Sequence, residues 1–232
     1  MRTHRPVRAR ALAAVVLTSA TLGALATTSA VAGATTLSAT AASCSDVDVV
    51  FARGTTEAPG FGQVGTPFTA SVATALPGRT VSTYAVVYDA NLSQTSAAPG
   101  STDLVRHVSA VSAACPGTRF VLSGYSQGAA VVDKALGVTV NDGAGPGTAL
   151  PAALSGRVAA AVVFGNPLGR QRQTIATASP TYGSRSKDYC NTGDPVCGGG
   201  ANVFAHLAYA SNGSAAAGGQ FAASLVLAPS TR

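Results

Sequence analysis

The sequence has little charge and no tryptophan. Of its 232 residues only 10% are charged, Glu57 is the one glutamate, and 47% are hydrophobic. So little charge excludes a coiled coil laced with ion pairs, and so large an apolar fraction excludes a disordered chain. The 26 glycines follow no regular period, which excludes a collagen-like repeat. The composition therefore indicates a globular protein with a real core, in one domain or two small ones.

Much of the positive charge lies in the first ten residues, at Arg2, Arg5, Arg8 and Arg10. An uncharged apolar run at 11–26 follows, and then small residues of the kind that signal peptidase cleaves. This order is typical of a secretory signal peptide, predicted at 1–34, with an Ala-, Thr- and Ser-rich leader at 35–43. A membrane anchor would need roughly 20 apolar residues, more than this run supplies. A lipoprotein signal ending at Cys44 is a further alternative, but the aliphatic residue usual three positions earlier is missing.

The mature chain is close to neutral. Without the four leader arginines, 11 basic side chains face 9 acidic ones. The high isoelectric point of the full sequence is therefore no argument for binding nucleic acid. We expect neither a nucleic-acid partner nor a stable membrane anchor, and we expect a monomer.

The cysteines agree with export. All four lie after the signal, at Cys44, Cys115, Cys190 and Cys197. An even number in an exported chain predicts two disulfides, for which three pairings are possible. The short separation favours Cys190–Cys197, which leaves Cys44–Cys115. Zinc is the alternative, but no C-x-x-C spacing is present and the histidines lie far away in sequence.

Strand-like and helix-like patterns alternate along residues 44–232, with no repeat and no long linker. Strands are predicted at 47–52, 80–88, 119–123 and 158–164. Helices are predicted at 66–76, 101–114, 127–136 and 220–227, with Ser101 or Asp103 as N-cap of the second. This alternation indicates a single α/β domain with a central parallel sheet and helices on both faces.

A G-x-S-x-G motif stands between the strand at 119–123 and the helix that follows it. Its central residue is Ser126, flanked by Gly124 and Gly128. At such an elbow the serine occupies a strained turn and its hydroxyl projects above the sheet. The motif also occurs by chance in a Gly- and Ser-rich chain, where the serine would be idle. The strand before it and the helix after it favour a nucleophile.

A serine nucleophile needs a base, usually a histidine, oriented by a carboxylate. His107 precedes Ser126 on a predicted helix, where it is expected to be structural. His206 follows Ser126 in what we expect to be a loop, and only it fits the chain order Ser, acid, His of the α/β-hydrolases.

The acid must lie between the serine and His206. The candidates are Asp133, Asp142, Asp188 and Asp194. Asp133 is expected to be a solvated helix residue and Asp142 a turn former. Asp194 lies inside the Cys190–Cys197 loop and before a proline, which restricts it as an orienting carboxylate requires. An aspartate that merely shapes this turn is the alternative.

At this point the sequence resembles the cutinase family, secreted serine esterases of the α/β-hydrolase fold. Four segments in order carry the resemblance: Ala52–Glu57 (ARGTTE), Gly124–Gly128 (GYSQG), Cys190–Cys197 (CNTGDPVC) and His206–Tyr209 (HLAY). The resemblance spans Cys44 to about residue 226, and the low charge is similar to that of actinobacterial members.

The resemblance implies a triad of Ser126, Asp194 and His206 and the disulfides Cys44–Cys115 and Cys190–Cys197. It implies an oxyanion hole from Gln127 and Thr55 and needs no cofactor or metal. Fungal relatives carry serine where this chain has Thr55. Threonine donates the same hydrogen bond, but its methyl group narrows the acyl site, which leaves the preferred chain length open.

The expected function is hydrolysis of carboxylic esters with short to medium acyl chains, in small molecules, lipids, cutin or other polyesters. An acetylxylan esterase is one alternative, although few aromatic residues are available to stack on sugar. A non-catalytic binding module on a hydrolase scaffold is another, but it would lack a triad member. The irregular segments 54–65, 89–100, 138–156 and 170–189 show no amphipathic stripe, so no lid is expected. Val203, Phe204 and Leu207 are expected to form an apolar rim.

Overall fold

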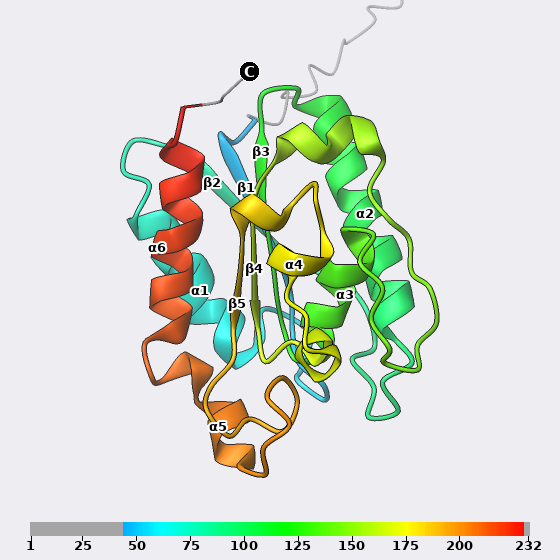
Figure 1. Cartoon of the computed structure of the whole chain (residues 1–232). Helices are drawn as coiled ribbons and strands as arrows, with labels where there is room; N and C mark the ends of the chain where they lie inside the picture. The colour runs from blue at the N-terminus through cyan, green and yellow to red at the C-terminus, as the bar shows by residue number, and fades with distance from the viewer. Residues whose placement is uncertain (1–43, 230–232) are drawn as a thin grey trace, which may run out of the picture. The chain divides into compact units, whose positions relative to one another are not determined.

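The computed structural model describes residues 44–229 (Figure 1). The predicted signal peptide and leader fall at 1–43, outside the described residues, as do 230–232. Within the described part, none of the helices is both long and apolar enough to cross a membrane.

The described residues contain one parallel sheet with the strand order β2-β1-β3-β4-β5. Its strands are β1 (Val47–Ala52), β2 (Val81–Ala85), β3 (Arg119–Tyr125), β4 (Val158–Phe164) and β5 (Ser186–Tyr189). The first four confirm the predicted strands. β1, β3 and β4 are almost entirely buried, as expected of strands covered on both faces. β5 was not predicted, because its sequence SKDY is polar and only four residues long.

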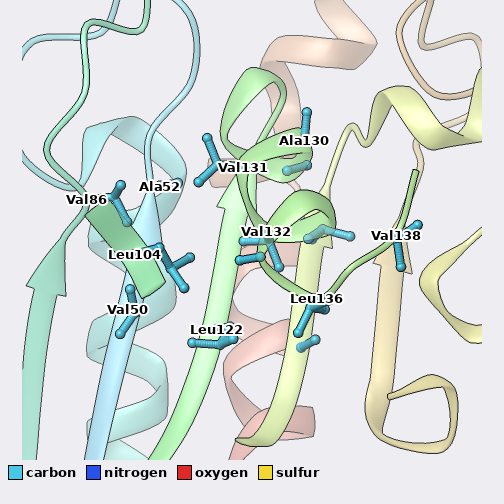
Figure 2. Packing of buried hydrophobic residues seen from close by; sticks show 14 of the residues in the cluster. Val50, Ala52, Val86, Leu104, Leu122, Ala130, Val131, Val132, Leu136 and Val138 are labelled. Carbon is cyan, nitrogen blue, oxygen red and sulfur yellow. The ribbon is translucent and has the colours of Figure 1, made fainter. Parts of the chain in front are cut away.

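Helices cover both faces of the sheet, as predicted (Figure 1). One face carries α1 (Gly62–Thr74) and α6 (Ser214–Leu227), and the other carries α2 (Ala97–Ala114) and α3 (Gln127–Ala135). Alternate strand residues point to opposite faces, so Val50 and Leu122 join the cluster under α2 and α3, whereas Val49 and Phe51 face α1 and α6. Figure 2 shows Val131 and Val132 of α3, and Leu136 directly after it, in the first of these clusters.

Three helices begin earlier than predicted, at Gly62, Ala97 and Ser214. α2 begins four residues before the predicted start, with Pro99 in its first turn, where the missing N–H has no helical partner to lose. Ser101 and Asp103 are therefore not N-caps. The Asp103 carboxylate instead accepts hydrogen bonds from Tyr84 Oη at 2.9 Å and Val87 N at 2.8 Å.

The remaining helical pieces are short. They are α4 (Ile175–Ala178), α5 (Val203–Leu207) and short 3₁₀ helices at Ala152–Arg157, Pro167–Gln171, Gly183–Arg185 and Ala208–Ala210. Two disulfides tie the chain. Cys44–Cys115 joins the segment before β1 to the end of α2, and Cys190–Cys197 closes the loop after β5.

Candidate functional site

Ser126 occupies the turn between β3 and α3, at the carboxyl edge of the sheet. Its backbone has φ 56° and ψ −119°, a conformation that residues other than glycine rarely adopt. Its N–H donates to Phe164 O at 2.9 Å. A side chain at Gly124 would collide with Gly128 O, and one at Gly128 with Ala52 O. The glycines of the motif are therefore needed for the close approach of β1, β3 and α3. The Ser126 side chain remains partly exposed.

His206 reaches Ser126 from the far end of the chain. Its Nε2 lies 2.9 Å from Ser126 Oγ, and its Nδ1 lies 2.8 Å from Asp194 Oδ2. The expected loop around His206 is wrong, because the residue lies in the short helix α5. Asn202 caps this helix by accepting from Ala205 N at 3.3 Å. A five-residue helix is too short to leave a periodic pattern in the sequence.

Asp194 is fully buried inside the disulfide-closed loop. Its Oδ1 accepts from Val196 N at 2.6 Å and Cys197 N at 3.3 Å, and its Oδ2 accepts from Tyr209 Oη at 2.6 Å as well as from His206. Burial alone would raise the pKa of Asp194. The hydrogen bonds from Tyr209, His206 and Val196 outweigh burial and lower that pKa, so the carboxylate stays ionised.

The other acid candidates lie elsewhere. Asp133 was expected to be solvated, and this is wrong: it lies on α3 but is fully buried, and Asn166 Nδ2 donates to it at 3.2 Å. Burial and the nearby charge of Asp188 raise the pKa of Asp133 well above its usual range. Asp188 accepts from Asn166 Nδ2 at 2.9 Å. Asp142 shapes a turn as expected, because its Oδ1 accepts from Ala144 N at 3.0 Å, and it also pairs with Lys134 Nζ at 3.0 Å. None of these contacts is to His206.

The second described histidine, His107, lies on α2 as expected. Its Nε2 is 2.7 Å from Asp48 Oδ2, and its ring stacks on Tyr84 at a centroid distance of 3.6 Å. Asp48 is the second residue of β1, so it lies at the amino ends of the strands, whereas Ser126 lies at their carboxyl ends. In residues 44–229, no three His, Cys, Asp or Glu side chains gather as ligands of a metal ion would.

Thr55 lies just after β1, and Gln127 is the first residue of α3, directly after Ser126. The N–H of a first helical residue has no acceptor within its own helix, which leaves it free for a ligand. Gln94 Nε2 donates to Thr55 Oγ1 at 2.9 Å. This bond occupies the hydroxyl as an acceptor and leaves its hydrogen available. Gln94 was missed, because it comes from a distant loop and adopts φ 64° without any local sequence signal.

Glu57 fixes the loop that carries Thr55. Its two carboxylate oxygens accept from Gly54 N at 2.6 Å and Gln63 N at 2.8 Å. Arg53 Nε donates to Glu57 O at 2.7 Å, and the guanidinium of Arg53 is buried against Tyr88. The only glutamate of the chain thus joins this loop to the start of α1.

Apolar side chains are exposed on the two segments that flank these residues. The predicted rim residues Val203, Phe204 and Leu207 all project from α5, with Phe204 81% exposed. Leu92, 78% exposed, adds to them from the loop whose Asn91 O accepts from Gln127 Nε2 at 3.2 Å.

Several known proteins are similar to this chain in sequence and in fold. A model of the cutinase family matches residues 43–226. The chain is 60% identical over 193 residues to a cutinase of Kineococcus radiotolerans, covering 82% of this chain and 65% of that protein. It is 40% identical to phospholipase Culp4 of Mycobacterium tuberculosis, covering 87% and 88% of the two chains.

Solved structures agree with these relatives. A Trichoderma reesei cutinase in complex with a phosphonate inhibitor superimposes with a TM-score of 0.64 at 30% identity, covering 80% of this chain and 78% of that one. An acetylxylan esterase superimposes with a TM-score of 0.69 at 27% identity, covering 79% and 100%. The matched family model spans more than half of the sequence, and these two solved structures cover about four fifths of it. The chain therefore belongs to the cutinase family of ester hydrolases.

Proposed function

We propose that this protein hydrolyses carboxylic esters of short to medium acyl chains through a Ser-His-Asp triad of Ser126, His206 and Asp194. The observation that carries the proposal is the unbroken chain of hydrogen bonds from Asp194 Oδ2 through the His206 ring to Ser126 Oγ. A structural serine at a strained turn would not need a histidine held by a buried carboxylate.

The reaction proceeds through an acyl-enzyme. His206 Nε2 takes the proton of Ser126 Oγ as this oxygen bonds to the ester carbonyl carbon, and the carbonyl electron pair moves onto its oxygen. The C–O bond to the alcohol then breaks, and His206 gives its proton to the leaving oxygen. Water repeats the same steps on the acyl-enzyme, releasing the acid and restoring the Ser126 hydroxyl. Asp194 stabilises the imidazolium that forms twice in each cycle.

The negative charge on the tetrahedral intermediate is stabilised by the N–H of Gln127 together with the N–H and hydroxyl of Thr55. Losing one such donor typically costs about 10²–10³ in kcat. Gln94 supports this role because it fixes the direction of the Thr55 hydroxyl.

The exposed rim supports an open site for esters. Phe204 is exposed on the helix that carries His206, and Leu92 is exposed beside Asn91, whose carbonyl oxygen accepts from the Gln127 side chain, while Ser126 is partly exposed. Of the four segments considered for a lid, 54–65 and 89–100 run into the starts of α1 and α2, and 170–189 contains α4 and β5. Segment 138–156 is mostly an exposed loop that runs into a 3₁₀ helix. We propose that the site admits dissolved esters and also the ester groups of lipids or polyesters.

A chromogenic ester series from C2 to C16 tests this function on the purified protein, with Ser126→Ala as the inactive control. We expect the highest kcat/KM around C4–C8, with no jump in rate where the substrate exceeds its solubility. A sharp increase at that limit, with little activity on dissolved C4 ester, would indicate a lid. A strong preference for C2, together with release of acetate from acetylated xylan, would favour an acetylxylan esterase. Binding without turnover would favour the binding module.

We also propose that the chain is secreted. The predicted signal peptide and the two disulfides support export, because disulfides persist in oxidising compartments. Mass spectrometry of the protein from a culture medium should find the new N-terminus between residue 30 and Cys44. Retention of residues 1–34 on a cell-associated protein would instead indicate an anchor.

A further inference from the structure

Tyr209 lies where the loop that carries Asp194 meets the segment that carries His206. The side chain is fully buried. Its hydroxyl donates to Asp194 Oδ2 at 2.6 Å and accepts from Asn191 N at 3.0 Å. Tyr209 follows His206 by three residues, or about one helical turn, so both side chains reach the same carboxylate. The proposed reaction, as described above, gives this hydroxyl no role.

The carboxylate of Asp194 is held at both oxygens. Oδ1 accepts from the backbone of its own loop, whereas Oδ2 is shared by His206 Nδ1 at 2.8 Å and Tyr209 Oη. Burial, together with the hydrogen bond to Asp194, raises the pKa of Tyr209 far above any working pH. The phenol therefore remains a donor while the enzyme turns over.

We propose that Tyr209 is a positioning residue that fixes the Asp194 carboxylate and limits how strongly it attracts a proton onto His206. The inference rests on the proposed triad. A second donor on Oδ2 disperses the carboxylate charge, so the carboxylate stabilises the protonated ring of His206 less. The hydroxyl thus extends esterase activity toward acid, and it holds Oδ2 in line with Nδ1.

Few other titratable groups face this cluster. Tyr125 of β3 packs on His206 with a centroid distance of 5.0 Å, and its hydroxyl donates to His206 O at 2.9 Å. Burial and the charges of Glu57 and Asp194 raise the pKa of Tyr125, so it also stays neutral. The Glu57 carboxylate accepts hydrogen bonds from Gly54 N and Gln63 N. Neither group bonds to Asp194 Oδ2, which leaves Tyr209 as the donor that competes with His206.

Packing is the rival explanation, because the Tyr209 ring lies against Phe164 and Tyr125 at about 6 Å. Tyr209→Phe keeps the ring and removes the hydroxyl, so it separates the two roles. Tyr84→Phe is the matched control, since Tyr84 Oη also donates to a carboxylate, that of Asp103, away from the site.

The experiment measures kcat and KM on a dissolved C4 ester across pH 4.5 to 9 for the full protein. In Tyr209→Phe we expect kcat to fall roughly tenfold with little change in KM. The acid limb of the kcat/KM profile should move up by about 0.5–1 pH unit. Tyr84→Phe should keep the profile of the unsubstituted protein. An unmoved acid limb in Tyr209→Phe, whatever its kcat, would leave only packing and overturn the proposal.

A difluorinated tyrosine at position 209 gives the opposite test, and it keeps the hydroxyl with its hydrogen bonds, so it serves if Tyr209→Phe does not fold. Fluorination strengthens the phenol as a donor, so the acid limb should move to lower pH. A shift to higher pH, or none, would overturn the proposal. Failure of the triad itself is distinguishable, because Ser126→Ala would then remain active in the same assay.

Discussion

The described part of the molecule contains two His–Asp pairs with almost the same geometry. His206 Nδ1 lies 2.8 Å from Asp194, and His107 Nε2 lies 2.7 Å from Asp48. They differ in what the rest of the ring meets. The other nitrogen of His206 faces the hydroxyl of Ser126 at the carboxyl edge of the sheet, whereas the ring of His107 lies flat against Tyr84.

A histidine paired with a buried carboxylate is therefore no sign of catalysis by itself. The nucleophile, the strained turn that exposes it and the donors around it make the difference. Parallel strands place those parts at their carboxyl ends, where loops diverge and a substrate has room. His107 and Asp48 instead join α2 to the start of β1.

Alanine substitutions of the two histidines should give the largest contrast. His206→Ala removes the proposed base and should lower kcat/KM by at least about 10⁴-fold while the fold persists. His107→Ala should leave activity within about twofold. This substitution removes the hydrogen-bond partner of the buried Asp48 carboxylate, so it should lower the free energy of unfolding by about 1–3 kcal/mol. Kinetics and urea unfolding on both variants check this, and a large loss of activity in His107→Ala would break the distinction.

Substitutions at Thr55 sharpen the distinction, because a proposed oxyanion-hole donor lies near the His206–Asp194 pair and not near the His107–Asp48 pair. Thr55→Val should lower kcat about 10²-fold with a small effect on KM, because it removes a donor to the transition state. Gln94→Ala should lower kcat by roughly tenfold, since the Thr55 hydroxyl then loses only its fixed direction. Thr102→Val, on the exposed side of α2, is the matched control. A purely KM effect at Thr55 would place it in substrate binding instead.

The two disulfides extend the comparison, because each lies near one of the pairs. Cys190 and Cys197 enclose Asp194, so replacing both with serine should lower kcat roughly tenfold before the fold is lost. Cys44–Cys115 closes a separation of 71 residues against 7, and chain entropy assigns it about 4 kcal/mol of stability against about 2 kcal/mol. Its double serine variant should unfold at lower urea with kcat unchanged. Equal kcat in both variants would mean that the Cys190–Cys197 disulfide only stabilises the fold.

Asp133, a buried carboxyl with no histidine, should give an effect on stability alone. Its pKa is raised in the folded state, so the folded protein must take up a proton that the unfolded chain has released. This costs about 1.4 kcal/mol for each pH unit between the unfolded and folded pKa. Relative to the unsubstituted protein, Asp133→Asn should thus gain stability as pH rises from 4 to 7, with activity unchanged. A gain that is equal at both pH values would mean that Asp133 does not titrate as described.

Apolar periodicity and the order of motifs predicted the α/β class, the first four strands and the residues now found around Ser126. The segments that produce a signal are long or buried on both faces, as β1 and β4 are. β5 and α5 were not predicted, because both are short, β5 is polar and α5 is partly exposed. The burial of Asp133 was not predicted for a different reason. A charged residue on a helix is usually solvated, and only tertiary contact with Asn166 shows otherwise.

The central claim is that Ser126 becomes acylated with His206 as its base. The most direct measurement is peptide mapping by mass spectrometry after reaction with a fluorophosphonate, which mimics the ester carbonyl and stays on the nucleophile. The account predicts one adduct, on Ser126, formed at a similar rate in the unsubstituted protein and in His107→Ala, and far more slowly in His206→Ala. An adduct on another residue, or full esterase activity after Ser126 is blocked, would contradict it.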